Sequence, residues 1–348
     1  RLMPSEHPTL ADYLASWSQG DAVRIAVAET ISALTAASAE LSGLIAEGPF
    51  VRGLGETIGD AGGGDVKKFL DVESHKLFKS ALEKAPVAAM GSEEADAAEV
   101  LNDGAALVVA IDPLDGSSNI DTNVSIGTIF SVLPVPDGMS PDAALLQAGK
   151  EQVASGFILY GPQTTLVVTV RDGTHIFTMA PDDRVFQLTR RDLKIAPDKA
   201  EYAINASNER HWPAAVQAYM RDLKAGRDGP RRQDFNMRWV GSLVAEAYRI
   251  LIRGGIFLYP GDARKGYEKG RLRLVYEAIP LALLMSEAGG AATDGVTPIL
   301  DIEPESLHQR VSLVFGPPDE VERIAQYYEA RPGDRNSPLF SERGLLRG

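Results

Sequence analysis

The chain has 348 residues, of which 44% are hydrophobic and 24% charged, a composition typical of a globular protein with two domains or one large one. Acidic residues outnumber basic ones by 48 to 35, and the net charge of -13 argues against a surface that binds nucleic acid or anionic membranes in general. The absence of cysteine excludes disulfides, thiolate nucleophiles, iron–sulfur clusters and cysteine-ligated zinc.

Two helices and a series of strands are predicted in the first half. Apolar residues at helical spacing predict helices over 23–46 and 66–82, and the segment 59–65 between them is a glycine-rich turn. Apolar and β-branched runs, several in hairpin-like succession, predict strands at 87–90, 105–111, 124–135, 155–159, 165–171 and 175–179.

Strand and helix alternate beyond Pro197. The charged segment 190–200 contains this proline and is the best candidate for a linker, so we predict two α/β domains, residues 1–196 and 197–348. Helices are predicted in the second half at 213–224, 241–253, 279–288 and 318–330.

No segment combines a basic start with an uninterrupted apolar run, and no window approaches the length of a transmembrane helix. We therefore expect a cytoplasmic protein without a membrane partner.

The most informative segment is 112–121, Asp-Pro-Leu-Asp-Gly-Ser-Ser-Asn-Ile-Asp, which follows the apolar run 105–111 directly. Pro113 favours extended backbone at Asp112, so we expect the strand to end there, with the carboxylate exposed beyond the sheet edge. Asp115 can turn back to the same point. The Leu114 carbonyl supplies another hard oxygen of the kind that magnesium or manganese accepts.

Gly116, Ser117 and Ser118 open a polar turn or helix start, where unpaired N–H groups favour a phosphate. Asp, Pro, Gly, Ser and Asn are also ordinary turn formers, so a plain strand-to-turn connection is the alternative. The whole run favours a metal-assisted phosphate site.

Several acids far apart in the sequence lie at the ends of predicted elements, where their side chains can converge. Two carboxylates about 4 Å apart repel by about 4 kcal/mol at an effective dielectric constant of 20, so such a cluster must protonate or recruit cations. Glu277 precedes Pro280, a favoured first-turn residue, and should lie just ahead of a helix. Any one of these acids could instead be a solvated surface charge. The acids are Asp65, Asp71, Glu93, Glu94, Asp112, Asp115 and Glu277.

Other phosphate chemistries fit less well. Haloacid-dehalogenase-type phosphatases need Asp-x-Asp, whereas the spacing here is Asp-x-x-Asp. The glycines of 261–266 have P-loop spacing but lack the following Lys-Ser/Thr. The histidines are scattered without metal-ligand spacing and are interpreted as surface or packing residues: His7, His75, His175, His211 and His308.

The run 112–121 and a series of further segments, in order over nearly all of the chain, resemble class I fructose-1,6-bisphosphatase. Asp-Pro-Leu-Asp-Gly is shared with the wider inositol-monophosphatase-like superfamily, whereas Ser-Ser-Asn-Ile-Asp and Leu-Arg-Leu-Val-Tyr-Glu point to the bisphosphatase branch. The resemblance implies a layered α/β sugar-phosphatase fold with mixed sheets sandwiched by helices, two or more Mg²⁺ per subunit, with Mn²⁺ possible, and a homotetramer. The further segments are 67–71, 91–94, 123–130, 207–209, 238–242 and 271–277.

The resemblance also implies residue roles. Glu94 would be shared between metal binding and water activation, Asp71 would be its partner as proton acceptor, and Asp65 would hold a more mobile or third metal. The other metal ligands would be Glu93, Asp112, the Leu114 carbonyl, Asp115 and Glu277. Substrate would contact Asp115, Gly116, Ser117 and Ser118 at the reacting phosphate, and Asn208, Tyr259, Arg271 and a neighbouring subunit's Arg238 at the distal phosphate.

The implied activity is hydrolysis of the 1-phosphate of D-fructose 1,6-bisphosphate by a metal-activated water, in gluconeogenesis or the Calvin cycle. Sedoheptulose 1,7-bisphosphate is an alternative or second substrate. A sugar-phosphate sensor without catalytic activity is the alternative function from a different class. Trp239, His211 and Arg271 depart from residues common in the family. Ala106 and Leu107 replace a Lys-Tyr pair of AMP-inhibited relatives, so we expect weak or absent AMP inhibition.

Overall fold

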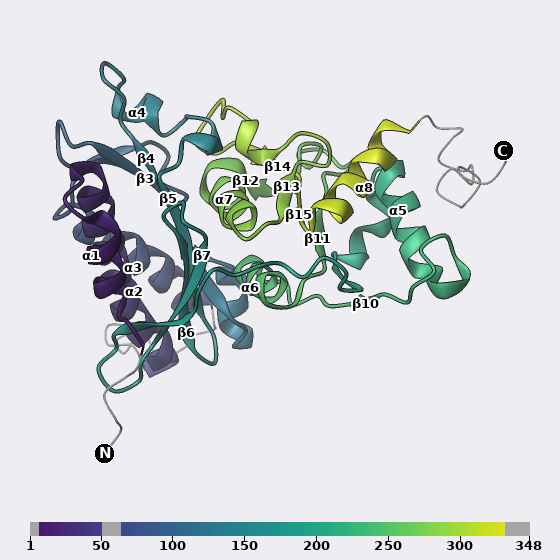
Figure 1. Ribbon diagram of the computed structural model, residues 1–348, viewed down its shortest axis with the longest axis horizontal. Coiled ribbons are helices and arrows are strands. Elements are labelled where there is room, and N and C mark those ends of the chain that lie inside the picture. The colour runs from purple at the N-terminus through teal and green to yellow at the C-terminus, as the bar shows by residue number, and fades with distance from the viewer. Residues whose placement is uncertain (1–6, 51–63, 331–348) are drawn as a thin grey trace.

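The computed structural model describes residues 7–50 and 64–330 and has alternating layers of helix and sheet (Figure 1). Three helices cover one face of an eight-stranded sheet, two lie between that sheet and a five-stranded one, and two cover the outer face of the second sheet. The predicted layered α/β fold is confirmed. In that order the helices are α1 (Leu10–Ser18), α2 (Ala22–Glu47) and α3 (Gly64–Leu82); α6 (Leu243–Arg253) and α7 (Ile279–Glu287); and α5 (Ala214–Lys224) and α8 (Pro318–Glu329).

The larger sheet has the strand order β2-β1-β3-β4-β5-β6-β7-β8, in which only β1 and β3 pair in parallel. Every strand predicted in the first half is present, and β2 and β8 are additional. The strands are β1 (Val87–Ser92), β2 (Glu99–Val100), β3 (Leu107–Asp115), β4 (Ile126–Pro134), β5 (Ala154–Tyr160), β6 (Thr164–Thr169), β7 (Thr174–Met179) and β8 (Phe186–Arg190).

The smaller sheet has the order β10-β9-β11-β15-β13, and β12 and β14 form a separate two-stranded ribbon. These strands are β9 (Glu201–Ala203), β10 (Asn236–Met237), β11 (Ile256–Tyr259), β12 (Leu272–Arg273), β13 (Ala291–Thr293), β14 (Arg310–Val311) and β15 (Leu313–Gly316). Short helical turns are α4 (Pro141–Ala144), the 3₁₀ turns Gly48–Phe50, Ser117–Thr122, Gly149–Glu151, Ala206–His211, Gly226–Asp228 and Ile299–Asp301, and the π-helical turn Leu274–Ala278.

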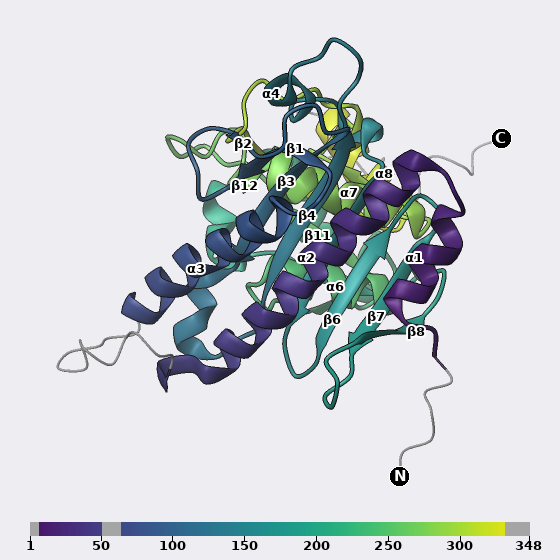
Figure 2. The ribbon, with the colours of Figure 1, turned by 90° about the vertical axis from the view of Figure 1, so that its left-hand side faces the viewer.

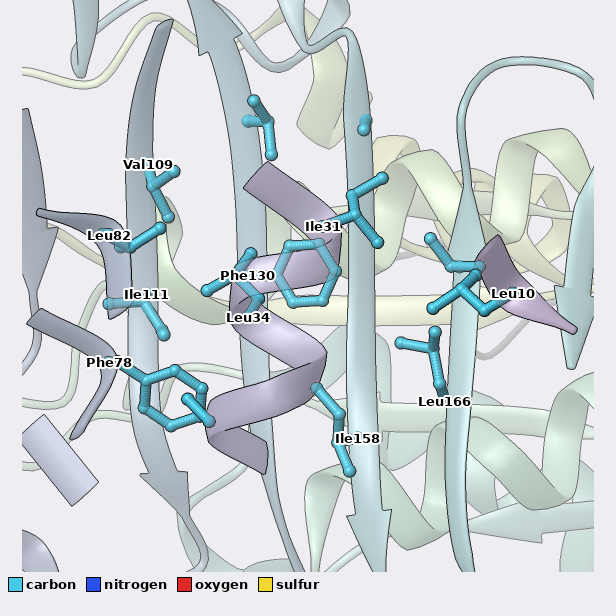
Figure 3. Packing of buried hydrophobic residues seen from close by; sticks show 14 of the residues in the cluster. Leu10, Ile31, Leu34, Phe78, Leu82, Val109, Ile111, Phe130, Ile158 and Leu166 are labelled. Carbon is cyan, nitrogen blue, oxygen red and sulfur yellow. The ribbon is translucent and has the colours of Figure 1, made fainter. Parts of the chain in front are cut away.

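Helix α2 lies diagonally across the larger sheet (Figure 2). Figure 3 shows Ile31 and Leu34 of this helix against Phe130 of β4, and all three side chains are fully buried. The prediction that no window approaches transmembrane length is wrong for α2, since its 26 residues include a window of mean hydropathy 1.3, of which 44% is buried. Packing on the sheet accounts for the buried apolar residues, such as Ile31 and Leu34, and a core helix passes the same test of length and composition.

The segment 191–200 connects the two sheets, where the linker is predicted. The hydrophobic cluster between the sheets includes Phe157 of the larger sheet, Phe257 and Phe315 of the smaller one, and Leu284 of α7. One core therefore joins residues from both sides of the segment, and a domain boundary at 196 stays a prediction.

Gly127 on β4 lets α6 approach the larger sheet closely. A Cβ atom at this position would lie 2.4 Å from the Ile158 carbonyl oxygen and 2.7 Å from a methyl carbon of Val244. Only glycine fits such a contact without a backbone shift. The close approach brings the first turn of α6 against the end of β3, where the site begins.

Candidate active site

Asp112 lies inside the protein. Strand β3 continues through Pro113 to Asp115, and Asp112 is only 3% exposed, so the prediction that the strand ends at Asp112 with an exposed carboxylate is wrong. The pairing of β3 with β4 is irregular between Asp112 and Asp115, and a proline is tolerated at such a bulge. The Asp112 carboxylate accepts a hydrogen bond from the Leu114 amide (3.0 Å), and the Pro113 carbonyl accepts one from the Thr128 hydroxyl (2.9 Å).

Asp112, Asp115 and Glu277 form a buried cluster, and one oxygen of each lies within 4.8 Å of the others. Among the side chains that the structure describes, which leave out those of residues 64–68, it is the only group of three or more that meets this test for a metal site. Glu277 belongs to the π-helical turn directly before α7, so its predicted position ahead of that helix is confirmed. The turn also directs the Arg273 amide at the Glu277 carboxylate, at 2.5 Å.

The environment of the cluster disfavours negative charge. Burial, and then the charges of Glu93, Asp115 and Glu277, raise the pKa of Asp112 well above its usual range. Burial raises the pKa of Asp115 to about 7, although the Val244 amide at the start of α6 donates a hydrogen bond to this carboxylate and opposes the shift. Burial, Asp115 and Glu93 likewise raise the pKa of Glu277.

A divalent cation fits this donor set, because hard carboxylate oxygens held close together are its preferred ligands. Glu93, directly after β1, adds a fourth carboxylate, and its amide donates to the Ile111 carbonyl of β3 (3.1 Å). Arg273 forms an ion pair with Glu93 at 3.1 Å and donates to the His308 carbonyl. One guanidinium beside four carboxylates leaves negative charge for a bound cation to balance.

Sequence reasoning assigned no role to Arg273. The resemblance includes this residue in the segment 271–277 but implies no role for it. The sequence signal for this ion pair is an arginine four residues before Glu277. The same spacing is common in segments that form no binding site.

The three remaining predicted acids are Glu94, Asp71 and Asp65, and they differ in exposure and in how much of each the structure describes. Glu94 is exposed in the turn after β1, and its amide donates to Ser92 Oγ (3.3 Å). Asp71 is half-buried on α3, and its pairing with Glu94 stays a prediction. Asp65 lies in the first turn of α3, which begins at Gly64, and not in the preceding loop as predicted. Its side chain and residues 59–63 lie outside the described part of the chain.

The predicted helix start after Asp115 is present as a 3₁₀ turn, Ser117–Thr122. Gly116 precedes it with φ +75°, a left-handed conformation that favours glycine. Asn119 in this turn donates to the Gly241 carbonyl at 2.9 Å, which ties the turn to the loop before α6. Ser117 is half-buried and Ser118 exposed, beside the acid cluster.

Two residues that the sequence did not indicate, Arg264 and Tyr267, connect Asn208 with Arg271. Arg264 donates from Nη2 to Asn208 Oδ1 at 2.9 Å, and its guanidinium lies 5.4 Å from the centre of the Tyr267 ring. The guanidinium of Arg271 lies 3.9 Å from the centre of the Tyr267 ring. No motif marks Arg264 or Tyr267, since both lie in an irregular loop.

Arg238 lies apart, after β10. Its side chain is 54% exposed, and its Nε lies 3.8 Å from buried Glu201. The neighbouring Trp239 places its ring 6.1 Å from that of Tyr259. A single chain does not test whether Arg238 reaches another subunit, so this role stays a prediction.

A layered α/β fold that holds buried hard oxygen ligands next to a glycine-serine turn defines a class of enzymes that use divalent cations on phosphate esters. Comparison with known proteins narrows the class. The family model described as fructose-1-6-bisphosphatase, N-terminal domain, matches residues 19–191, and the corresponding C-terminal domain model matches residues 195–329.

Named relatives agree. The class 1 fructose-1,6-bisphosphatase of Azorhizobium caulinodans is 52% identical over 92% of this chain and 99% of its own length. That of Methylorubrum populi is 50% identical over 97% of this chain and 98% of its own. The crystal structure of Leishmania major fructose-1,6-bisphosphatase in holo form, 30% identical, superposes with a TM-score of 0.83 over 93% of this chain and all of that one. The chain belongs to the class 1 fructose-1,6-bisphosphatase family, which confirms the resemblance and implies use of a divalent metal.

The acid cluster predicts a pH-dependent stability. In protein stripped of divalent cations by a chelator, the folded-state pKa of Asp115, about 7, lies above its ordinary 3.8. An acid with a raised folded pKa stabilises the fold while protonated, and that stabilisation is lost as the pH rises from about 4 to about 7. We expect the thermal midpoint to fall by on the order of 5 °C between about pH 5 and pH 8, measured by calorimetry.

Saturating Mg²⁺ should remove most of this fall, because a cation favours the ionised carboxylates. A chelated protein as stable at pH 8 as at pH 5 would contradict the prediction.

Proposed function

We propose that the chain hydrolyses the 1-phosphate of D-fructose 1,6-bisphosphate to give fructose 6-phosphate and inorganic phosphate. The observation that carries the proposal is the buried cluster Asp112, Asp115 and Glu277 beside the turn Gly116–Thr122, in a chain of this family. The second polar cluster, around Asn208 and Arg271, supplies what a bisphosphate needs in addition, an anion site that orients the substrate without reacting.

Each group then has a role. Asp112, Asp115, Glu277, Glu93 and the Leu114 carbonyl would hold the divalent cations. When bound, these cations supply a Lewis acid for the phosphoryl oxygens and lower the pKa of water.

The chain's other groups would orient the substrate and move protons. Glu94, with Asp71, would accept the proton of the attacking water, and Asp65 would serve a further cation. Gly116, Ser117 and Ser118 would receive the reacting phosphate through backbone amides and hydroxyls. No covalent phosphoenzyme is required. Asn208, Tyr259, Arg271 and a neighbouring subunit's Arg238 would hold the distal phosphate.

Several finer points belong to the same proposal. We propose Mg²⁺ as the ion, with Mn²⁺ possible, a homotetramer in the cytoplasm, weak AMP inhibition, and two domains meeting near residue 196. No nucleic-acid or membrane partner is proposed. The pathway is gluconeogenesis or the Calvin cycle, and sedoheptulose 1,7-bisphosphate is a second candidate substrate.

Phosphate release tests the proposal directly. With Mg²⁺ we expect rapid release from fructose 1,6-bisphosphate, and with excess chelator almost none, in a colorimetric phosphate assay. Sedoheptulose 1,7-bisphosphate assayed in parallel gives the substrate range from the ratio of kcat/KM values. Absence of release from both esters would contradict the proposed activity and favour a sugar-phosphate sensor.

A further inference from the structure

The loop between β11 and β12 contains a charged pair, in which buried Asp262 contacts half-buried Arg264. Asp262 is only 6% exposed, and its carboxylate accepts hydrogen bonds from Arg264 Nε (3.0 Å) and Nη2 (2.5 Å). Such a two-point contact fixes the plane of the guanidinium. The loop itself is tied down, since the Asp262 amide donates to the Tyr267 carbonyl (2.9 Å) and the Gly261 amide to Ser312 Oγ (2.7 Å).

The guanidinium of Arg264, held by Asp262, also donates a hydrogen bond to Asn208. Nη2 donates to Asn208 Oδ1 at 2.9 Å, and Asn208 is 9% exposed. A guanidinium can only donate, so the carboxamide atom that faces it must be the oxygen. The contact therefore fixes which end of this amide faces Arg264.

The Asn208 amide nitrogen is left available. Among the described residues, its Nδ2 makes no hydrogen bond, and Arg264 and Arg271 both lie against the Tyr267 ring, with guanidinium-to-centre distances of 5.4 and 3.9 Å. Phosphate oxygens at neutral pH accept hydrogen bonds, so an asparagine serves a phosphate only when it presents its NH₂ group. Without Arg264 the carboxamide could rotate and present its oxygen, which would repel the anion.

We propose that Arg264, held by Asp262, is a positioning residue that keeps the NH₂ group of Asn208 directed at the distal phosphate of the substrate. The inference rests on the proposed function, because it takes Asn208 as a ligand of that phosphate. It adds a specificity-determining pair, Asp262 and Arg264, that acts on the non-reacting end of the substrate.

The test uses Arg264→Met in the full chain with Mg²⁺. A charge-assisted hydrogen bond contributes about 1.5 kcal/mol, so we expect a roughly tenfold rise in KM for fructose 1,6-bisphosphate and in the dissociation constant of fructose 6-phosphate. We expect kcat, and kcat/KM for fructose 1-phosphate, which lacks the distal phosphate, to change less than twofold. Lys265→Met is the matched control, since it removes a neighbouring exposed charge and should change none of these values.

A double-mutant cycle separates positioning from direct contact. In an Asn208→Ala background, Arg264→Met should weaken fructose 6-phosphate binding by less than a further twofold, because the residue acts through Asn208. If the two substitutions weaken fructose 6-phosphate binding by independent factors that multiply in the double variant, the inference is overturned. An unchanged preference of Arg264→Met for fructose 1,6-bisphosphate over fructose 1-phosphate would also overturn it. Should Arg264→Met unfold, Asp262→Asn keeps the shape of the side chain but weakens the two-point contact that holds the guanidinium, so it should also raise the dissociation constant of fructose 6-phosphate. An unchanged dissociation constant in a folded Asp262→Asn protein would count against the inference.

Binding separates this inference from the proposed activity. A wild-type protein that binds fructose 6-phosphate but hydrolyses neither sugar bisphosphate would contradict the proposed activity. The dissociation constants of fructose 6-phosphate, measured by calorimetric titration, would still decide the role of Arg264. A wild-type protein that does not bind fructose 6-phosphate would overturn the inference itself.

Discussion

Asp112→Asn is expected to lower Mg²⁺-dependent phosphate release from fructose 1,6-bisphosphate by about 10³-fold, equivalent to ~4 kcal/mol of transition-state stabilisation. The substitution keeps the size of the side chain but removes one of the clustered carboxylates that would hold the cation. The same change should raise the thermal midpoint of the chelated protein at pH 8, because it removes a buried charge that Glu93, Asp115 and Glu277 disfavour. Kinetic assays and calorimetry on the same preparation measure the rate of phosphate release and the thermal midpoint.

Opposite signs of the two effects distinguish a functional role from damage to the fold. Asp137→Asn, in the exposed loop after β4, is the matched control and should change neither value. An Asp112→Asn protein that loses both activity and stability in chelator would contradict the assignment, since a purely structural role would produce that result.

Local pattern predicted most of the fold. Strands β3 to β7 and helices α2, α5 and α6 have the apolar periodicity that burial on a sheet imposes, and this signal needs no long-range information. Helix α1 was missed because it has only nine residues, and its start depends on a capping box between Thr9 and Asp12.

Tertiary contacts account for the error at Asp112. Pro113 correctly signals a break in regular pairing, but whether the break lies at a sheet edge or inside a bulged strand depends on β4. Glu277, which meets Asp112 in the buried cluster, arrives on a π-helical turn from the other half of the chain. The residue spacing within 112–121 indicates neither the bulge in β3 nor the contact with Glu277.

The distal cluster illustrates the same limit. The hydrogen bond from Arg264 to Asn208 spans 56 residues and joins an irregular loop to a 3₁₀ turn. A resemblance can transfer Asn208 and Arg271 because they match family positions. It cannot supply Asp262, Arg264 or Tyr267, whose importance depends on a fixed guanidinium and a stacked ring.

Glu94→Gln is expected to retain the fold and fructose 6-phosphate binding while kcat falls by about 10²–10³-fold, because a carboxamide of the same shape cannot accept the proton of the attacking water. Glu94 is exposed in the turn after β1, which Glu93 ties to β3, so the substitution disturbs no core contact. Asp96→Asn, two residues further along the same turn and also exposed, should leave kcat within twofold and controls for charge. Single-turnover kinetics and calorimetric titration with fructose 6-phosphate separate chemistry from binding. Unchanged turnover would remove Glu94 from the mechanism and leave Asp71 as the candidate proton acceptor, whereas parallel loss of turnover and of product binding would assign Glu94 to metal binding alone.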